Sequence, residues 1–198
     1  MSGHAPGRSG GVLGRAALLA RLRADPPLVR GLADPERQVQ PHGIDLRLAS
    51  VWRFASAGLL GRDPFPSQGG SRLAPGQASS EPARPDRALP EREALPFDDQ
   101  GALHLPPGAY LVRFEEIVHL PLDLMALARP RSTLLRCGAA LHTAVWDAGY
   151  QGRSEALLIV ANPHGLGLER GARICQMIFL PVTTPGAGYV GTYQGENV

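Results

Sequence analysis

The chain is organised around the stretch Pro130-Arg131-Ser132-Thr133-Leu134-Leu135-Arg136-Cys137-Gly138. Two guanidinium groups and two hydroxyl groups fall within one short segment, which can receive phosphate oxygens through charge-assisted hydrogen bonds. A second segment, Ala144–Gly152, follows at short range and places the carboxylate of Asp147 before a turn. An anion-binding segment beside a lone carboxylate indicates phosphate-ester chemistry, in which Asp147 polarises a water and the arginines neutralise developing negative charge.

Length and composition narrow the class of protein. A chain of 198 residues is long enough for one core and favours a single domain. The formal net charge of +2 is too small to indicate a nucleic-acid or membrane-surface protein. Lys is absent, so no site can use a lysine ammonium group. No apolar run approaches a membrane-spanning length and no secretory signal is recognisable, so we expect a cytoplasmic protein.

The cysteines and other metal-ligating residues predict no metal centre held by the protein alone. Cys137 and Cys175 occur in apolar sequence surroundings, and we expect both to be free thiols in a reducing compartment. No group of His, Cys and acidic residues has the spacing of zinc ligands, so a zinc-dependent mechanism is not predicted.

Short apolar-alternating segments with turn residues between them predict a mainly β protein, a barrel or jelly-roll-like sandwich with a short N-terminal helix. We expect a disordered N-terminus over residues 1–12 and one domain over 13–198. That domain would contain a Pro/Gly-rich insertion at about 55–100, either disordered or a lid, and a C-terminal tail from about 183. The helix is expected at 13–22, and the clearest strands at 40–54, 109–114, 155–161 and 172–182.

Four segments in order resemble the motifs of the dUTPase and dCTP deaminase superfamily of all-β, trimeric nucleotide enzymes. They are Gln40–Leu48, Pro130–Gly138, Val145–Gly152 and Gly171–Val182. The resemblance covers residues 40–54 and 103–195, and it implies a distorted jelly-roll or β-barrel fold. It also implies a homotrimer with active sites at subunit interfaces and a small-molecule deoxynucleoside triphosphate as ligand.

The resemblance assigns a role to each matched residue. Asp147 would be the base that activates water for attack on the α-phosphate, and Tyr150 would pack on the deoxyribose. Gln176 would support the base or the attacking water. The predicted phosphate-binding residues are Arg131, Ser132, Thr133 and Arg136, partly from a neighbouring subunit, together with Tyr189. Mg²⁺ would bridge the triphosphate through its oxygens and water. Structural roles remain open for several of these residues: a turn cap for Asp147, a core aromatic for Tyr150, and strand or trimer-axis structure for Gln176 and Arg173.

Two branches of the superfamily compete. The N-terminal helix, the turn at Leu105–Gly108 and the ending Tyr189–Gly195 are similar to the deaminase branch. In deaminases a glutamate on the strand after the third motif moves protons at the cytosine amine, and ungapped alignment from Gly152 puts Leu157 there. A leucine cannot transfer protons. Glu155 would point to the same face of the strand and is the candidate substitute.

Other departures concern base recognition and the tail. The chain between the second and third motifs is slightly shorter than in the family. The uracil-reading Asn of ordinary dUTPases falls near Leu141 or His142, so base recognition is expected to use strand backbone groups. In the tail, Thr192 and Glu196 stand where the family has Lys and Gln. An acidic residue is unfavourable near a triphosphate, so we expect tail closure to differ here.

The leading hypothesis is a homotrimeric dUTP diphosphatase that converts dUTP to dUMP and pyrophosphate with Mg²⁺. The first alternative is dCTP deamination, alone or coupled to hydrolysis, with Glu155 transferring protons. The second is a non-catalytic nucleotide-binding trimer. These three remain open at the level of the sequence.

Overall fold

The computed structural model describes residues 11–60, 87–183 and 186–198. The chain divides into two units: residues 1–53 with 94–198, and residues 54–93. The N-terminal residues 1–10, for which disorder was predicted, lie outside the described part, as do residues 61–86 within the predicted insertion.

The smaller unit, residues 54–93, contains short strands that the sequence did not predict. Strand β4 (Leu59–Leu60) pairs antiparallel with β5 (Arg87–Ala88), and β6 (Arg92–Leu95) begins at the end of this unit. The prediction of a Pro/Gly-rich insertion at about 55–100 therefore did not include β4, β5 and β6. Strands of two to four residues are too short for an alternating pattern to be recognised.

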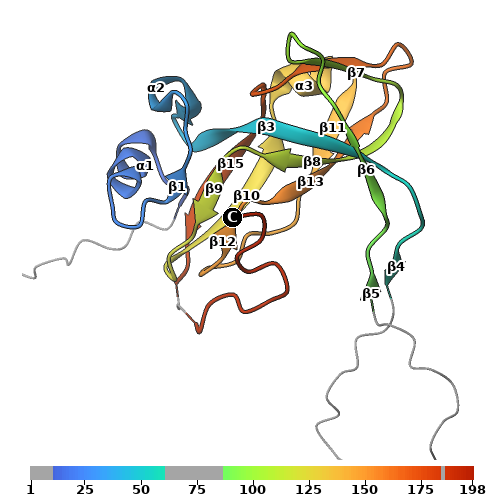
Figure 1. Ribbon diagram of the computed structural model, residues 1–198. Coiled ribbons are helices and arrows are strands. Elements are labelled where there is room, and N and C mark those ends of the chain that lie inside the picture. Colours follow the sequence, from blue (N-terminus) through green and yellow to red (C-terminus); the bar gives the residue numbers. More distant parts are fainter. Residues whose placement is uncertain (1–10, 61–86, 184–185) are drawn as a thin grey trace, which may run out of the picture. The chain divides into compact units, whose positions relative to one another are not determined.

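The larger unit is built around one antiparallel sheet in which β10, β15, β3, β8, β13 and β11 are neighbours in that order (Figure 1). Their bounds are β3 Gly43–Phe54, β8 Gly108–Phe114, β10 Leu124–Pro130, β11 Ala139–His142, β13 Glu155–Val160 and β15 Arg173–Pro181, and β2 (Val39–Gln40) pairs with β3. A three-stranded sheet joins β1 (Val29–Arg30), β9 (Ile117–His119) and β12 (Gln151–Gly152), and a two-stranded one joins β7 (Ala102–Leu105) and β14 (Leu166–Glu169).

The main sheet curves until its two ends meet. Strands β10 and β11 stand at opposite ends of the strand order yet lie next to each other. After β11, Trp146 exchanges two backbone hydrogen bonds with Ala126 of β10, at 2.9 and 3.0 Å. The indole Nε1 of the buried Trp146 donates to Ser154 Oγ at 3.0 Å. The predicted mainly β, barrel-like fold is confirmed.

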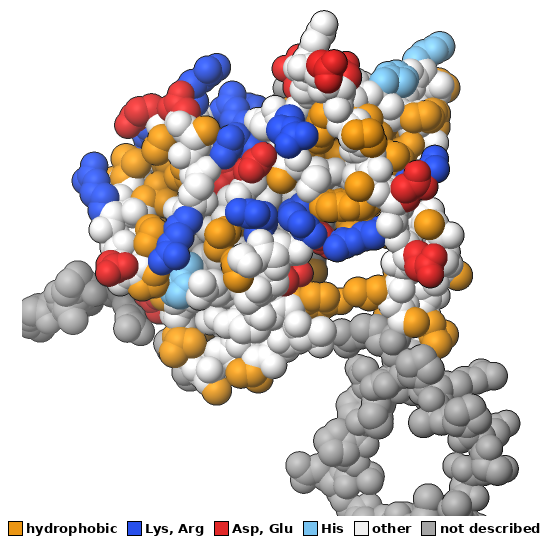
Figure 2. All heavy atoms as spheres, viewed as in Figure 1, with side chains coloured by type: hydrophobic (Ala, Val, Ile, Leu, Met, Phe, Trp, Pro, Cys, Tyr) orange, Lys and Arg blue, Asp and Glu red, His pale blue; other side chains and the backbone are white. Residues whose placement is uncertain are grey.

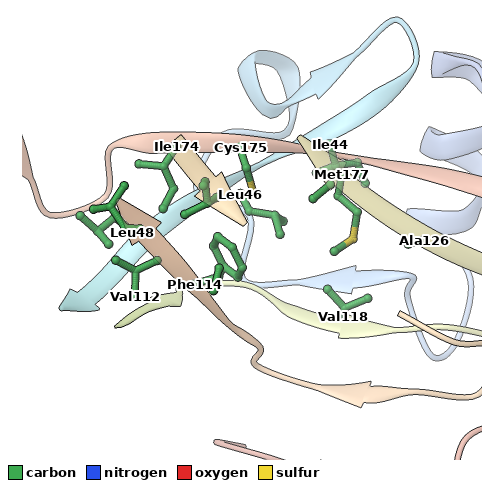
Figure 3. Packing of buried hydrophobic residues seen from close by; sticks show 14 of the residues in the cluster. Ile44, Leu46, Leu48, Val112, Phe114, Val118, Ala126, Ile174, Cys175 and Met177 are labelled. Carbon is green, nitrogen blue, oxygen red and sulfur yellow. The ribbon is translucent and has the colours of Figure 1, made fainter. Parts of the chain in front are cut away.

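The core lies inside this curved sheet and follows the alternation predicted for β3. Ile44, Leu46 and Leu48 are fully buried and pack with Val112, Phe114 and Met177, as Figure 3 shows. Strand β13 also alternates: every second residue is buried, and the residues between are partly exposed. The apolar run at 155–161 therefore contains a strand with one buried face.

Three helices occur in the described residues. Helix α1 (Arg15–Leu22) confirms the predicted N-terminal helix and buries Leu18. Helices α2 (Pro35–Gln38) and α3 (Ser132–Arg136) were not predicted, because helices of four or five residues show no apolar periodicity. Both cysteines are free: Cys175 is buried, whereas Cys137, directly after α3, is exposed despite its apolar sequence neighbours.

The end of α3 is fixed by Gly138. This glycine has φ +77°, a conformation that residues with a side chain rarely adopt. A Cβ atom placed there would lie 2.8 Å from Cβ of Asn162. Asn162 in turn donates from Nδ2 to the carbonyl of Cys137 at 3.1 Å. A glycine at this position therefore lets the chain turn from α3 into β11 without strain or a steric clash.

We expect Gly138→Ala to lower the free energy of unfolding by about 2 kcal/mol, because it adds backbone strain and a steric clash. Urea denaturation at one fixed protein concentration measures the change. Gly167→Ala is the matched control, since a Cβ at Gly167 meets nothing within 4 Å. Equal stability of the two variants would contradict this account of the turn.

Candidate active site

The phosphate-binding segment predicted from the sequence lies at the surface. The backbone N–H of Arg131 donates to Ile174 O of β15 at 3.0 Å, which fixes the start of α3 on the sheet. Ser132, Thr133 and Arg136 are exposed on α3, while Leu134 is buried and anchors the helix. Figure 2 shows arginine side chains gathered across one face, with acidic side chains between them. Two hydroxyls and two guanidinium groups are thus available to an anion from solvent.

A buried carboxylate, that of Asp45, lies against the guanidinium group of Arg131. Oδ2 of Asp45 lies 3.2 Å from Nε of Arg131 and 3.2 Å from Nη1 of Arg173. Asp45 is only 1% exposed, and Gln176 pairs opposite it on β15. The pKa of the Asp45 carboxyl is raised above its usual value, because the effect of burial exceeds the opposite effect of the two guanidinium groups. The structure therefore brings Arg131, Arg173 and Gln176 together around Asp45.

Asp45 was not among the predicted site residues. In the sequence it looks like an ordinary polar position of an alternating strand, between Ile44 and Leu46. Both faces of β3 are covered at this point, so the carboxylate is as buried as its apolar neighbours. Only the pairing of β3 with β15, distant in sequence, shows this, and no local pattern signals it.

The third segment exposes the carboxylate of Asp147. Its backbone carbonyl accepts a hydrogen bond from the N–H of Tyr150 at 3.1 Å, which closes a turn through Gly149 at φ +86°. The Asp147 side chain makes no hydrogen bond or ion pair with any residue of the described ranges. A carboxylate in this state can accept a proton from water.

Tyr150 is buried beneath the C-terminal tail. Its hydroxyl donates to Glu196 Oε1 at 2.8 Å, and its ring meets Tyr189 edge-on at a centroid distance of 5.8 Å. The tail is also attached by backbone bonds, from Gly195 N to Gln151 O at 2.8 Å and from Arg153 N to Glu196 O at 2.9 Å. The tail therefore packs on the third segment of its own chain, and Glu196 is bonded to the tyrosine.

One chain does not bring the phosphate-binding segment and Asp147 together. Trp146, the neighbour of Asp147, pairs with Ala126 of β10, whereas Arg131 follows the far end of that strand. The backbone positions of Ala126 and Arg131 are separated by roughly 17 Å at the rise of a β-strand. The predicted site residues therefore form two clusters, Arg131–Arg136 with Gln176, and Asp147 with Tyr150 and Tyr189.

On β13, the strand that could support deamination, the carboxylate of Glu155 is paired with Arg113. Glu155 and Leu157 share the partly exposed face of β13, as predicted. Oε1 of Glu155 accepts from Arg113 Nη2 at 2.7 Å and from Nε at 3.1 Å. The Arg113 guanidinium lies over the ring of Trp52 at 4.7 Å. Glu155 is therefore held by a fixed arginine, and the apolar Leu157 occupies the position predicted for a proton-transfer group.

Within the described ranges, no three His, Cys, Asp or Glu side chains are grouped so that they could hold a metal ion. None of the described helices is long and apolar enough to cross a membrane.

The architecture defines a class of protein: a curved antiparallel β barrel with an arginine-rich surface segment and an exposed carboxylate at Asp147. A family model described as dCTP deaminase-like matches residues 12–182, so the chain belongs to the dCTP deaminase-like family. The resemblance inferred from the four motifs is confirmed.

Relatives within this family are named for dUTP hydrolysis. The chain is 42% identical over 177 residues to a probable deoxyuridine 5'-triphosphate nucleotidohydrolase of Methanosarcina mazei, covering 89% of this chain and 92% of the relative. It is 44% identical over 171 residues to a protein of the same name from Archaeoglobus fulgidus, covering 86% and 89%.

A solved structure shares the fold. The 2'-deoxycytidine 5'-triphosphate deaminase of Agrobacterium tumefaciens matches with a TM-score of 0.60 at 24% identity over 88% of this chain. The match spans 49% of that deaminase, about half its length.

The buried Tyr150 predicts a specific pH dependence of stability. Burial, with the Glu196 hydrogen bond, raises the pKa of Tyr150 well above its ordinary value. The folded state thus keeps the phenol proton at pH values where the unfolded state loses it, so this stabilisation is complete below about pH 10 and declines above it. Relative to Tyr150→Phe, the wild type should lose about 1 kcal/mol of unfolding free energy between about pH 9 and 11. Urea denaturation across this range measures the difference, and a pH-independent difference would contradict the raised pKa.

Proposed function

We propose that this chain hydrolyses dUTP to dUMP and pyrophosphate. The observation that carries the proposal is the exposed carboxylate of Asp147, free of partners in the described chain and placed beside Tyr150. The names of the relatives that share more than two-fifths of their residues with this chain support the same reaction. The chemistry needs a base near water and an anion-binding surface, for which Asp147 and the Arg131–Arg136 segment are the candidates. Tyr150, which the tail covers in this structure, is the candidate for contact with the sugar.

In the proposed reaction, Asp147 accepts a proton from a water molecule whose oxygen attacks the α-phosphorus of dUTP. A new P–O bond forms as the bond between the α-phosphorus and the bridging oxygen breaks. The products are dUMP and pyrophosphate, and the proton taken by Asp147 returns to solvent. Arg131 and Arg136 would neutralise the charge that develops on the leaving group, with Ser132 and Thr133 donating hydrogen bonds. Gln176 and Tyr189 would support the bound nucleotide, and Tyr150 would pack on the deoxyribose.

We propose Mg²⁺ as the cofactor, held mainly by triphosphate oxygens and water. The residues present fit this arrangement, since Asp147 is exposed and the described residues form no preformed cage of three or more His, Cys, Asp or Glu ligands. When bound, the ion would neutralise phosphate charge. The protein's own residues would then position the triphosphate and remove the proton.

We also propose that the active protein is a homotrimer whose active sites lie between subunits. Roughly 17 Å of strand separates the two clusters of one chain, whereas the water that Asp147 would activate and the leaving group that Arg131 would contact meet at the same α-phosphorus. A neighbouring copy that presents its Arg131–Arg136 segment to Asp147 would complete the site.

Deamination of dCTP is the weaker alternative. The position predicted for the proton-transfer glutamate is Leu157, and Glu155 is held by Arg113 at 2.7 Å. To take the place of Leu157, Glu155 would need a bulge or a shifted register in β13, which pairs with β8 without a break. No described contact favours that rearrangement, and nothing in the site specifically favours a non-catalytic role.

Wild-type protein supplied with Mg²⁺ should release pyrophosphate from dUTP and no ammonia from dCTP. Asp147→Asn should lower turnover of dUTP by about 10²–10⁴-fold, because it removes the base, and should leave the dUTP dissociation constant within a few-fold. Pyrophosphate and ammonia assays measure the two reactions, and calorimetry measures binding.

Glu169→Gln serves as the control for loss of one surface carboxylate, since Glu169 is exposed on β14, in a different sheet. Full turnover by Asp147→Asn would exclude the proposed base. Ammonia from dCTP would favour the deaminase, and dUTP binding without either product would favour the non-catalytic trimer.

Shared sites predict complementation between inactive variants. Arg131→Ala and Asp147→Asn should each be inactive alone. After mixed refolding in equal amounts, about a quarter of the sites in a random trimer would combine an intact Arg131 with an intact Asp147 from its neighbour. Recovered pyrophosphate release, compared with each variant refolded alone, measures this. No recovery, although mixed oligomers form, would place both residues in one subunit's site.

A further inference from the structure

The contact between Asp45 and Arg131 leaves a defined part of the arginine for a ligand. The carboxylate lies against Nε at 3.2 Å, the edge of the guanidinium nearest its stem. Arginine carries five N–H donors, and four of them are on the two terminal nitrogens. The Arg131 side chain is 32% exposed, whereas Asp45 is sealed from solvent. The terminal nitrogens are thus the part of Arg131 that an anion can approach.

Hydrogen bonds of Asp45 and of its neighbour Arg173 fix the position of the Asp45 carboxylate. The backbone carbonyl of Asp45 accepts from Nε2 of the buried Gln38 at 2.9 Å. Arg173, the second cation on its carboxylate, donates from Nη1 to the carbonyl of Arg37 at 2.6 Å, just before Gln38. The backbone of Arg131 is fixed separately, by its bond to Ile174 O at 3.0 Å. A long arginine side chain is therefore held both at its backbone and at its guanidinium group.

A buried ion pair is by itself weak evidence for a stabilising role. Burial raises the pKa of the Asp45 carboxyl in spite of the two adjacent arginines. What the carboxylate does supply is geometry, because an unpaired arginine on the surface would sample many rotamers.

We propose that Asp45 is a positioning residue for the phosphate-binding arginine, holding the Nε edge of Arg131 so that both terminal nitrogens are presented to a polyphosphate. This inference rests on the proposed function insofar as it takes a phosphate as the ligand. Asp45 acts through Arg131 and does not itself touch the nucleotide. Its effect therefore exists only while residue 131 is an arginine.

A double-mutant cycle tests this dependence. The dissociation constant of a non-hydrolysable α,β-imido analogue of dUTP is measured by calorimetry for the wild type, Asp45→Asn, Arg131→Ala and the double variant. Asp45→Asn should weaken binding about 10-fold, and Arg131→Ala about as much or more. The double variant should bind like Arg131→Ala alone. Additive losses would overturn the proposal, because a general structural effect of Asp45 would persist without the arginine.

Glu116→Gln is the matched control. Glu116 is also a fully buried carboxylate paired with an arginine of β3, with its Oε1 at 2.7 Å from Nε of Arg47, but Arg47 is not in the phosphate-binding segment. This variant should bind the analogue within about 2-fold of the wild type. A loss as large as that of Asp45→Asn would show that any disturbed buried ion pair weakens binding, and the proposal would fail.

Arg131→Lys keeps the proposal testable if Asp45→Asn does not fold. A lysine ammonium is a single point of charge, so it can face Asp45 or a phosphate but cannot hold both as arginine does. Arg131→Lys should therefore bind nearly as weakly as Arg131→Ala. Near wild-type affinity of Arg131→Lys would overturn the proposal, because charge alone would then suffice.

The same cycle is run with inorganic tripolyphosphate as a second probe. If the wild type binds tripolyphosphate but neither binds nor hydrolyses dUTP, the proposed function fails, and the tripolyphosphate cycle still decides the role of Asp45. If dUTP is hydrolysed and both cycles are additive, the proposed role of Asp45 is wrong while the proposed function stands.

Discussion

Strand β10 is hydrogen-bonded along both edges, and the arrangement of the barrel depends on this. One edge pairs with β15 over seven residues, from Leu124 opposite Pro181 to Pro130 opposite Cys175. The other edge receives Trp146 at Ala126, which closes the curved sheet. The phosphate-binding segment begins where β10 ends, and Asp147 follows the residue that closes the sheet. The spacing between the two clusters is therefore set by one strand, and a change in its register would move both.

A buried polar network links the N-terminal part of the chain to the same region. The side chain of Gln38 donates to Glu116 Oε1 at 2.8 Å and to the carbonyl of Asp45, and Glu116 accepts from Arg47. Buried polar groups require such partners, so the four-residue helix α2 cannot shift without leaving several of them unsatisfied. Asp45 joins this network through its backbone carbonyl, whereas its carboxylate faces Arg131 and Arg173 outside the network.

Local patterns in the sequence predicted the barrel but only part of the candidate site. The alternation of Ile44, Leu46 and Leu48 identified β3, and the ordered motifs identified the family, because both signals are contained within short segments. The burial of Asp45 could not be predicted in this way, since it arises from the pairing of β3 with β15, more than 120 residues later. The Tyr150–Glu196 hydrogen bond and the separation of Arg131 from Asp147 likewise depend on tertiary structure. The assigned roles of the site residues remain predictions.

The position of β15 in the sheet has a consequence for biosynthesis. It lies between β10 and β3, although it is the last strand of the barrel to be made. Until it is synthesised, β3 and β10 each present an unpaired edge, and such edges are templates for pairing with other chains. Pairing between residues so far apart in sequence is also slow to form. These two edges are thus open to pairing with other chains before β15 is made, and β15 covers both of them in the folded barrel.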